Sequence, residues 1–490
     1  QRSFLGVAIS ATSNALMVAE RWSTTNTDNQ SWCSEQYNET RVSVIDISDP
    51  SGNINVHTRF SRHGDLSDQF KQTYIYDEAN QRGVYLGIFA RNEWSDCDRV
   101  MRNTITSVDI TDGANPKELS SLDFGKPDET VRGSLFDARR KVAYAITVLV
   151  AQSLDPLYAI NIANLDKLEV LSAIDGLSGD VNVFRPIGDK GEFLLTVGRD
   201  NSAACEGFDN DRWAATRVAV SIFDTRDLQA TKLVQRRCVA LERARWSSSA
   251  VNSNLDQAHK MIGMYSDALV NLVAVPVSYY EETRNDESSW WWYSLRSAVG
   301  MLSWDLSRYD PALPPEQQSV LQNLATVIHP DGEVKRTVFL QRPGVGDTKR
   351  RVMLTLSDTH MAFNDVTDLE RPLLQSSVEV APYSAGVYRL GDHLVEQISV
   401  GGDSWGSGGY SYDDRRPTLF KVKRPASDGT LGDATELSRF MLAGVQKVLA
   451  HGDSALRQEP SHGWTRPPLG GLLVVELLQP KRRGHRQRRL

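Results

Sequence analysis

Short apolar runs recur along this chain in a repeating pattern. In seven places a run rich in β-branched residues ends at or near an acid or an amide, is followed by a turn, and leads into a second run. The copies are Thr40–Asp49, Asn103–Asp112, Asp155–Asn164, Thr216–Asp224, Val299–Leu306, Met361–Asp368 and Pro417–Val422. Successive copies are roughly 50 to 80 residues apart, more than a compact unit of four short strands needs, so the extra length is expected in loops.

Each copy is flanked by further runs with the character of β-strands. One run precedes each copy: Ala15–Arg21, Gly83–Ala90, Lys141–Leu149, Glu192–Arg199, Asn271–Tyr280, Arg351–Ser357 and His393–Val400. Earlier runs in the same units include Gln72–Asp77, Val131–Asp137, Asp180–Ile187, Glu333–Leu340 and Tyr383–Leu390. Runs that follow the copies include Ile54–Phe60, Glu118–Phe124, Glu169–Ile174 and Thr231–Val239.

Four short strands per unit, with almost no helical periodicity, predict an all-β fold. The specific prediction is a β-propeller of about seven four-stranded blades over residues 1–442, with eight blades as the alternative. One blade cannot bury both faces of its sheet alone, so neighbouring blades are expected to pack face to face and ring closure to bury the rest.

In a propeller, the connections between the second and third strands of the blades share one face. Their lengths are therefore informative about function. The predicted loops are Trp22–Glu39, Arg91–Arg102, Val150–Ser153, Asp200–Ala215, Glu281–Ser297, Asp358–His360 and Gly401–Arg416, of which five are long. They hold a large share of the tryptophans, namely Trp32, Trp94, Trp213, Trp290, Trp291, Trp292 and Trp405, with Trp22 at an edge.

Indole rings on polar loops are costly to expose without a purpose. We interpret these tryptophans as a recognition surface for a glycan, a peptide or a protein loop. The alternative is that the rings fold back and fill gaps between the loops.

The four cysteines, Cys33, Cys97, Cys205 and Cys238, show no CxxC spacing, which argues against a zinc or thioredoxin-type site. Cys33 and Cys97 lie in equivalent loops of adjacent blades, and Cys205 and Cys238 belong to the fourth blade. Two disulfides, Cys33–Cys97 and Cys205–Cys238, are therefore predicted, and disulfides indicate an exported protein. Four buried free thiols are the alternative.

Other motifs give weaker indications. Gly402-Asp403-Ser404-Trp405-Gly406 fits the GxSxG pattern of a nucleophile elbow, but the loop-like sequence after it lacks the helix that this chemistry needs. Asp209 and Asp211, and next Asp413 and Asp414, could bind Ca²⁺, whereas a solvated loop is the alternative. No other cofactor is predicted, and the nine histidines show no metal-binding spacing.

Composition narrows the class of protein further. The net charge of −7 and the absence of a basic stripe argue against nucleic acid as a partner of the main body. No apolar stretch is long enough to span a bilayer. The chain begins at Gln1, which is expected if a signal peptide has been removed or the sequence trimmed.

Residues 443–490 differ from the rest and are expected to form an irregular extension. Gly471–Leu478 is one more apolar strand, which would close the ring or begin an incomplete eighth blade. Lys481–Leu490 carries six Lys or Arg and is predicted to be a disordered basic tail, with binding to nucleic acid or another acidic surface as the alternative.

Four segments resemble the secreted β-propeller domain family of bacteria and archaea: Asp65–Phe89, Asp155–Asp200, His259–Ser278 and Gly332–Pro372. The resemblance covers most of Val42–Phe440 and implies a secreted or cell-surface propeller. It implies no established activity that can be transferred residue by residue.

The sequence thus favours an exported, non-enzymatic binding or scaffold propeller. It would be secreted, periplasmic or on the cell surface, and its partner would be an extracellular or envelope protein or a glycan bound at the long-loop face. The alternative is an enzyme with a metal or cofactor in the central channel, which rests on analogy of fold alone. Oligomeric state cannot be predicted from these patterns.

Overall fold

The computed structural model describes residues 2–26, 35–95, 98–148, 156–174, 179–200, 217–241, 244–249, 251, 255–284, 291–342, 350–380, 384–390, 393–399, 417–424, 435–443, 447–451, 454–458 and 473–476. It divides into two compact units, described separately below. Unit 1 comprises Gln1–His329, Val334–Thr355 and Phe363–Gln375, and unit 2 comprises Pro330–Glu333, Leu356–Ala362 and Ser376–Leu490.

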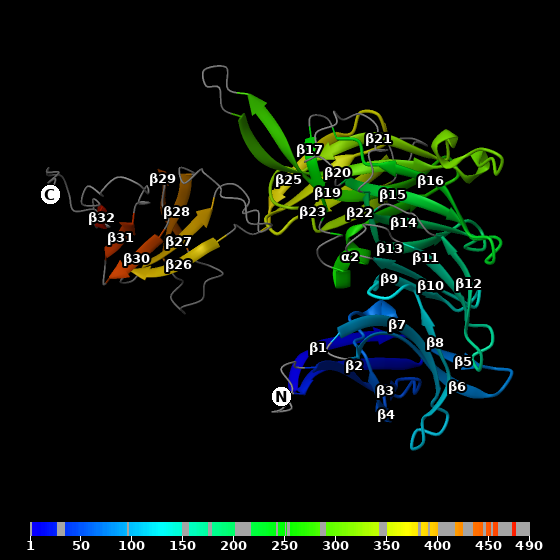
Figure 1. Ribbon diagram of the computed structural model, residues 1–490. Coiled ribbons are helices and arrows are strands. Elements are labelled where there is room, and N and C mark those ends of the chain that lie inside the picture. Colours follow the sequence, from blue (N-terminus) through cyan, green and yellow to red (C-terminus); the bar gives the residue numbers. More distant parts are fainter. Residues whose placement is uncertain are drawn as a thin grey trace, which may run out of the picture. The chain divides into compact units, whose positions relative to one another are not determined.

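Seven antiparallel sheets follow one another along the chain, and we call each of them a blade (Figure 1). Blades 1 and 2 consist of β1 (Arg2–Ala11), β2 (Ala15–Asn26), β3 (Glu35–Asp46) and β4 (Asn55–His63), then β5 (Gln72–Asp77), β6 (Arg82–Ser95), β7 (Asp98–Asp109) and β8 (Lys117–Phe124). Blades 3 and 4 consist of β9 (Thr130–Asp137), β10 (Val142–Val148), β11 (Leu157–Asn161) and β12 (Glu169–Ile174), then β13 (Asp180–Ile187), β14 (Phe193–Asp200), β15 (Arg217–Asp224) and β16 (Lys232–Cys238).

The later blades follow the same order. Blade 5 consists of β17 (Ala244–Ser248), β18 (Gly263–Ser266), β19 (Asn271–Arg284), β20 (Trp291–Trp304) and β21 (Leu321–Ile328). Blade 6 consists of β22 (Arg336–Arg342), β23 (Arg350–Leu356), β24 (His360–Asp365) and β25 (Leu373–Glu379), and blade 7 of β26 (Ser384–Leu390), β27 (His393–Ser399), β28 (Pro417–Arg424) and β29 (Thr435–Ala443). The seven predicted copies fall on the third strands of these blades, β3, β7, β11, β15, β20, β24 and β28.

The acids that end the repeat copies close the turns that follow the third strands. The Asp46 carboxylate accepts the Ser48 N–H at 2.8 Å, and the Asp49 carboxylate accepts the Ser51 N–H at 2.8 Å. The same arrangement recurs at Asp109 and Asp112, Asn161 and Asn164, Asp224 and Asp227, Asp305 and Asp310, and Asp365 and Asp368. A short side-chain acceptor replaces a backbone partner in such turns, so these side chains have a structural role in the turns.

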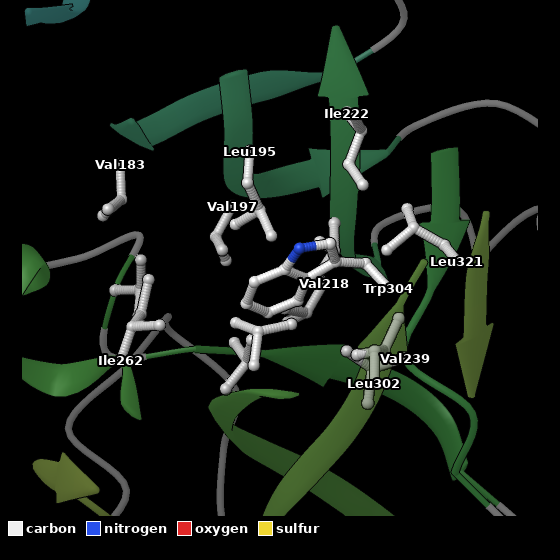
Figure 2. Close-up of a cluster of buried hydrophobic side chains, with 14 of the residues drawn as sticks. Val183, Leu195, Val197, Val218, Ile222, Val239, Ile262, Leu302, Trp304 and Leu321 are labelled. Atoms are coloured by element: carbon white, nitrogen blue, oxygen red, sulfur yellow. The ribbon is translucent and has the colours of Figure 1, made fainter. Parts of the chain in front are cut away.

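The hydrophobic core of unit 1 lies between the blades. Separate clusters join blades 1 and 2, 2 and 3, 3 and 4, 4 and 5, and 5 and 6. The cluster between blades 4 and 5 contains Trp304, whose indole Figure 2 shows beside Val197, Val218 and Leu195. Apolar side chains on both sides of a sheet bury area only when a neighbour covers them, which is why the blades stack face to face.

Arginines join neighbouring blades at the ends that carry the turn-closing acids. Arg82 at the start of β6 donates to both carboxylate oxygens of Asp166 in blade 3, at 2.9 and 2.6 Å. Between blades 5 and 6, Arg351 lies 3.3 Å from the Asp267 carboxylate. Burial tends to raise the pKa of Asp267, but hydrogen bonds from Leu269, Tyr265 and Val270 and the Arg351 charge outweigh it and lower that pKa to about 2.

Arg140 makes the corresponding contacts between blades 3 and 4. Its guanidinium donates to the Tyr144 hydroxyl at 3.0 Å, to the Gly191 carbonyl at 3.0 Å, and to both the hydroxyl and the carbonyl of Thr225. Its partners belong to two different blades, so this one side chain ties the β9–β10 turn to blade 4.

We expect Arg140→Ala to lower the free energy of unfolding by about 2 kcal/mol, because it leaves several acceptors at this seam without a donor. Arg140→Lys should fall between the alanine variant and the wild type, because one ammonium cannot reproduce the planar fork. Urea denaturation followed by circular dichroism measures the effect. Arg139→Ala is the matched control: Arg139 is exposed and should change stability by less than about 0.5 kcal/mol. An equal loss in both variants would contradict this role for Arg140.

The described part of residues 443–490 is more regular than the sequence predicted. β30 (Lys447–His451), β31 (Ser454–Gln458) and β32 (Leu473–Glu476) form a three-stranded antiparallel sheet within unit 2. β32 lies inside the predicted strand Gly471–Leu478, whereas β30 and β31 were not predicted. In the parts of the chain that the structure describes, no helix is long and apolar enough to cross a membrane.

Candidate functional site

Among the described residues, the connections between the second and third strands form extended hairpins in three blades of unit 1. β2 and β3 remain paired as far as Asn26 and Glu35, and β6 and β7 as far as Ser95 and Asp98. The predicted loops Trp22–Glu39 and Arg91–Arg102 are therefore largely strand, which corrects the sequence interpretation. The two strands of a solvated ribbon pair their backbone N–H and C=O groups with each other, so neither strand needs a buried face. Their sequences therefore lack the alternation of apolar and polar residues that predicts a strand.

The hairpins of blades 1 and 2 are braced against each other. The Gln36 carbonyl in β3 accepts hydrogen bonds from Trp94 Nε1 at 3.0 Å and from Asn92 Nδ2 at 3.3 Å, both in β6. The Gln36 side chain also donates to the Ser23 hydroxyl at 2.7 Å. These contacts place the two hairpins side by side, which shows that the second-to-third connections of blades 1 and 2 share one face. In a propeller these connections are expected on one face, and we call the connections β2–β3, β6–β7 and β19–β20 together the hairpin face.

Ion pairs secure the base and the flank of the braced hairpins. Arg21 in β2 binds both oxygens of Asp65, at 2.5 and 2.8 Å, where the chain enters blade 2. On β6, Arg91 lies 2.6 Å from the Asp123 carboxylate and 3.0 Å from Glu93. The Arg21 pair is mostly buried and has bidentate geometry, whereas the Arg91 pairs are exposed to solvent and contribute little to stability.

Trp22 lies at the other side of the blade 1 hairpin. The Phe4 ring packs edge-on against it with centroids 5.1 Å apart, and the Arg2 guanidinium lies 4.7 Å from its centroid. Its Nε1 is buried and has no hydrogen-bond acceptor among the described residues. Phe4, by contrast, is 54% exposed, so an aromatic surface with an unused donor beneath it opens to solvent here.

The third extended hairpin belongs to blade 5. β19 and β20 pair continuously from Asn271 and Trp304 to Arg284 and Trp291. β17 accompanies β19 only to Glu281, and β21 accompanies β20 only to Ala298. The ends of the two strands therefore continue as a ribbon of two strands, where the sequence had predicted a loop over Glu281–Ser297 (Figure 1).

The structure describes few of the predicted site residues. Trp94 lies on β6, and the backbone of Trp291 and Trp292 lies at the start of β20. Trp32, Trp213, Trp290, Trp405, Asp209, Asp211, Asp413, Asp414 and the Gly402–Gly406 motif lie outside the described residues. Trp94 and Trp22 both contact neighbouring groups, as the gap-filling alternative expects for these two rings. The binding role of the tryptophans and the Ca²⁺ site stay predictions.

Cys238 at the end of β16 is disulfide-bonded. Cys33, Cys97 and Cys205 lie outside the described residues, so the pairings Cys33–Cys97 and Cys205–Cys238 stay predictions. The carbonyl of Cys238 accepts a hydrogen bond from Asn323 of β21 at 3.0 Å, which ties this end of blade 4 to blade 5.

Sequence reasoning missed the residues that hold the hairpin face together. Gln36 acts through its main-chain carbonyl, which has no sequence signature. Asn92 stood inside a segment predicted to be a loop. Within the described ranges, no three histidine, cysteine or carboxylate side chains gather where they could hold a metal ion.

Successive four-stranded antiparallel blades with cores between them define a β-propeller. The family model for the Beta propeller domain matches residues 6–369, and the chain belongs to that family. The predicted all-β propeller fold is thereby confirmed, with a blade count close to the seven expected. No curated protein matches the chain at a significant level.

Several solved structures are similar at low sequence identity. A protein from Lactobacillus plantarum is 10% identical with a TM-score of 0.32, over 86% of this chain and 96% of that one. Drosophila Plexin A, solved in complex with Semaphorin 1b, is 8% identical with a TM-score of 0.38, over 81% and 84%. A puromycin hydrolase is 11% identical with a TM-score of 0.31, over 82% and 60%. With scores this low, these likenesses carry nothing about the function of this chain.

Proposed function

We propose that this chain is an exported binding or scaffold propeller that contacts a protein, peptide or glycan through its hairpin face. The observation that carries the proposal is the set of paired strands that continue past the blades on β2–β3, β6–β7 and β19–β20. Extended ribbons contribute little to the core, so their length is better explained by contact with a partner.

The brace between blades 1 and 2 supports this proposal. A partner that meets mobile loops has to order them on binding, and that ordering weakens the association. Hydrogen bonds from Trp94 and Asn92 to the Gln36 carbonyl fix two hairpins before any partner arrives. The exposed Phe4 ring would provide an apolar contact for a partner.

Export to an oxidising compartment is part of the proposal. A disulfide at Cys238 would persist in secreted, periplasmic or cell-surface proteins and would be reduced in most cytosols. Mass spectrometry of the protein as isolated tests this point. All four cysteines alkylated without prior reduction would remove the support for export.

The binding site is tested by screening the full chain on a glycan array and against purified envelope proteins. For a ligand found this way, we expect the combined change of Trp290, Trp291 and Trp292 to alanine to weaken binding at least tenfold, because aromatic side chains dominate recognition surfaces. Trp94→Phe keeps a ring but removes the donor to Gln36, and we expect a smaller loss through loosening of the hairpins.

Leu269→Ala is the matched control. Leu269 is 85% exposed and lies in the β18–β19 turn, at the opposite end of the blade 5 sheet from the β19–β20 hairpin. It should bind the same ligand as the wild type does. Unchanged affinity in the triple variant, or a loss in Leu269→Ala of equal size, would contradict the assignment to the hairpin face.

A further inference from the structure

The first strand of blade 5 is interrupted. β17 pairs with β19 up to Ser248 opposite Ser278, and β18 resumes the pairing at Gly263 opposite Ala274. Between these two points β19 contains Pro276, which has no N–H to give to a neighbouring strand. The interruption therefore falls beside a residue that could donate no hydrogen bond to a continuous first strand. The helix α2 (Leu255–Met261) is inserted at this point.

Two other blades hold α2 by hydrogen bonds. In blade 4, Arg185 Nη2 on β13 donates to the His259 carbonyl at 2.6 Å. In blade 6, the Thr337 hydroxyl on β22 donates to the Met261 carbonyl at 2.6 Å. β13 and β22 are first strands of their blades, as β18 is in blade 5, so α2 is anchored to the strand edges that line the centre of a propeller. Ala258 and Met261 are buried at 1% and 3% exposure.

A fourth blade reaches α2 through Phe70. This residue belongs to the 3-10 turn η1 (Gln69–Lys71), which leads into β5 of blade 2, and its ring packs edge-on against His259 with centroids 4.8 Å apart. Blades 3 and 4 lie between blades 2 and 5 in the stack of hydrophobic clusters. The contact between Phe70 and His259 therefore joins two blades that are not neighbours in this stack.

The surroundings of Arg185 show what α2 contributes. Burial lowers the pKa of its guanidinium, and within the described part of the chain it donates to the carbonyls of Phe184 and His259. A desolvated cation needs these acceptors, so removing α2 would leave Arg185 short of one. The helix and the first strand of blade 4 thus depend on each other.

We propose that the helix α2, Leu255–Met261, is a plug held against the inner, first-strand edges of the blades of unit 1. Side chains of blades 2, 4 and 6 hold it in place. This inference goes beyond the proposed binding function, since it concerns the centre and not the hairpin face.

Hydrogen–deuterium exchange with mass spectrometry on the full chain tests the plug. We expect Arg185→Ala and Phe70→Ala each to raise the exchange rate of peptides covering residues 255–261 at least tenfold, while the outer strands β12 and β16 keep their protection. Arg226→Ala is the matched control. Arg226 also belongs to blade 4, but it pairs with Asp224 and lies over Phe193 and Tyr309, away from α2.

Three results would overturn the proposal. Exchange in α2 that is already fast in the wild type would show that nothing holds the helix. A response to Arg185→Ala without a response to Phe70→Ala would show a helix tethered to blade 4 alone. If neither variant changes the exchange rate of α2, neither contact holds the helix in place. Should an alanine variant lose protection throughout the chain, Arg185→Lys and Phe70→Leu give the same comparison with milder changes.

Discussion

Trp304→Ala is expected to lower the free energy of unfolding by about 3 to 5 kcal/mol, as the loss of a buried aromatic ring does in other proteins. Trp304 is 5% exposed and belongs to the cluster that joins blades 4 and 5. Figure 2 shows its indole among side chains from both blades, including Leu195, Val218 and Leu302. The variant leaves a cavity at the seam between two blades, so the seam weakens as well as the blade that carries the residue.

Urea denaturation followed by far-ultraviolet circular dichroism measures this effect without depending on tryptophan fluorescence. Trp304→Phe is the matched variant: it retains a ring of smaller volume and should lose less than half as much stability. If the alanine variant unfolds at the wild-type urea concentration, Trp304 does not form part of the seam.

Gly179→Ala is expected to have the second large effect, a loss of about 3 kcal/mol or more. Gly179 precedes β13 and has a φ of +97°, a conformation that residues with a Cβ rarely adopt. A Cβ at this position would overlap the Arg199 carbonyl oxygen and lie 2.6 Å from its carbonyl carbon. Both atoms belong to the backbone of β14, so β13 would have to move away from its partner strand.

Gly52→Ala separates the two causes. Gly52 also has a positive φ, +86°, but no atom lies within 4 Å of the Cβ that alanine would add. It should lose only about 1 kcal/mol from backbone strain. Thermal unfolding of the two variants side by side measures the difference, and equal midpoints would show that the clash with Arg199 has no effect.

The sequence predicted the blades well because the third strand of each carries two signals at once. β15, for example, combines a β-branched run with Asp224, which closes the following turn through Arg226 N–H. β12 and β13 were predicted with their observed bounds, Glu169–Ile174 and Asp180–Ile187. Buried strands bounded by turn residues are the pattern that sequence reasoning detects best.

The elements that the sequence did not predict share one physical cause: they have no apolar face of their own. The hairpin arms beyond Trp22 and Arg91 are held by backbone pairing and by contacts such as Trp94 with the Gln36 carbonyl. The split first strand of blade 5 depends on contacts from other blades to α2, which no local pattern encodes. The candidate site was predicted least well, because it consists of these connections between strands.

The tryptophans illustrate the same limit. Trp304 and Trp94 are the same residue type, yet one fills a seam between blades and the other donates from a hairpin to a neighbouring hairpin. The difference lies in position along the strand: Trp304 ends β20 beside the acid that closes the turn, and Trp94 stands past the point where β5 and β8 accompany their neighbours.

The aspartate-closed turns bear on how such a chain can grow in evolution. Asp109 and Thr111 lie two positions apart in the sequence, as do Asp365 and Thr367. The residues that close each turn therefore lie within a single repeat. Duplication of a gene fragment one blade long would therefore produce a blade that already contains the residues for the turn after its third strand. Only the surfaces toward its two neighbours would remain to be adapted by later substitutions.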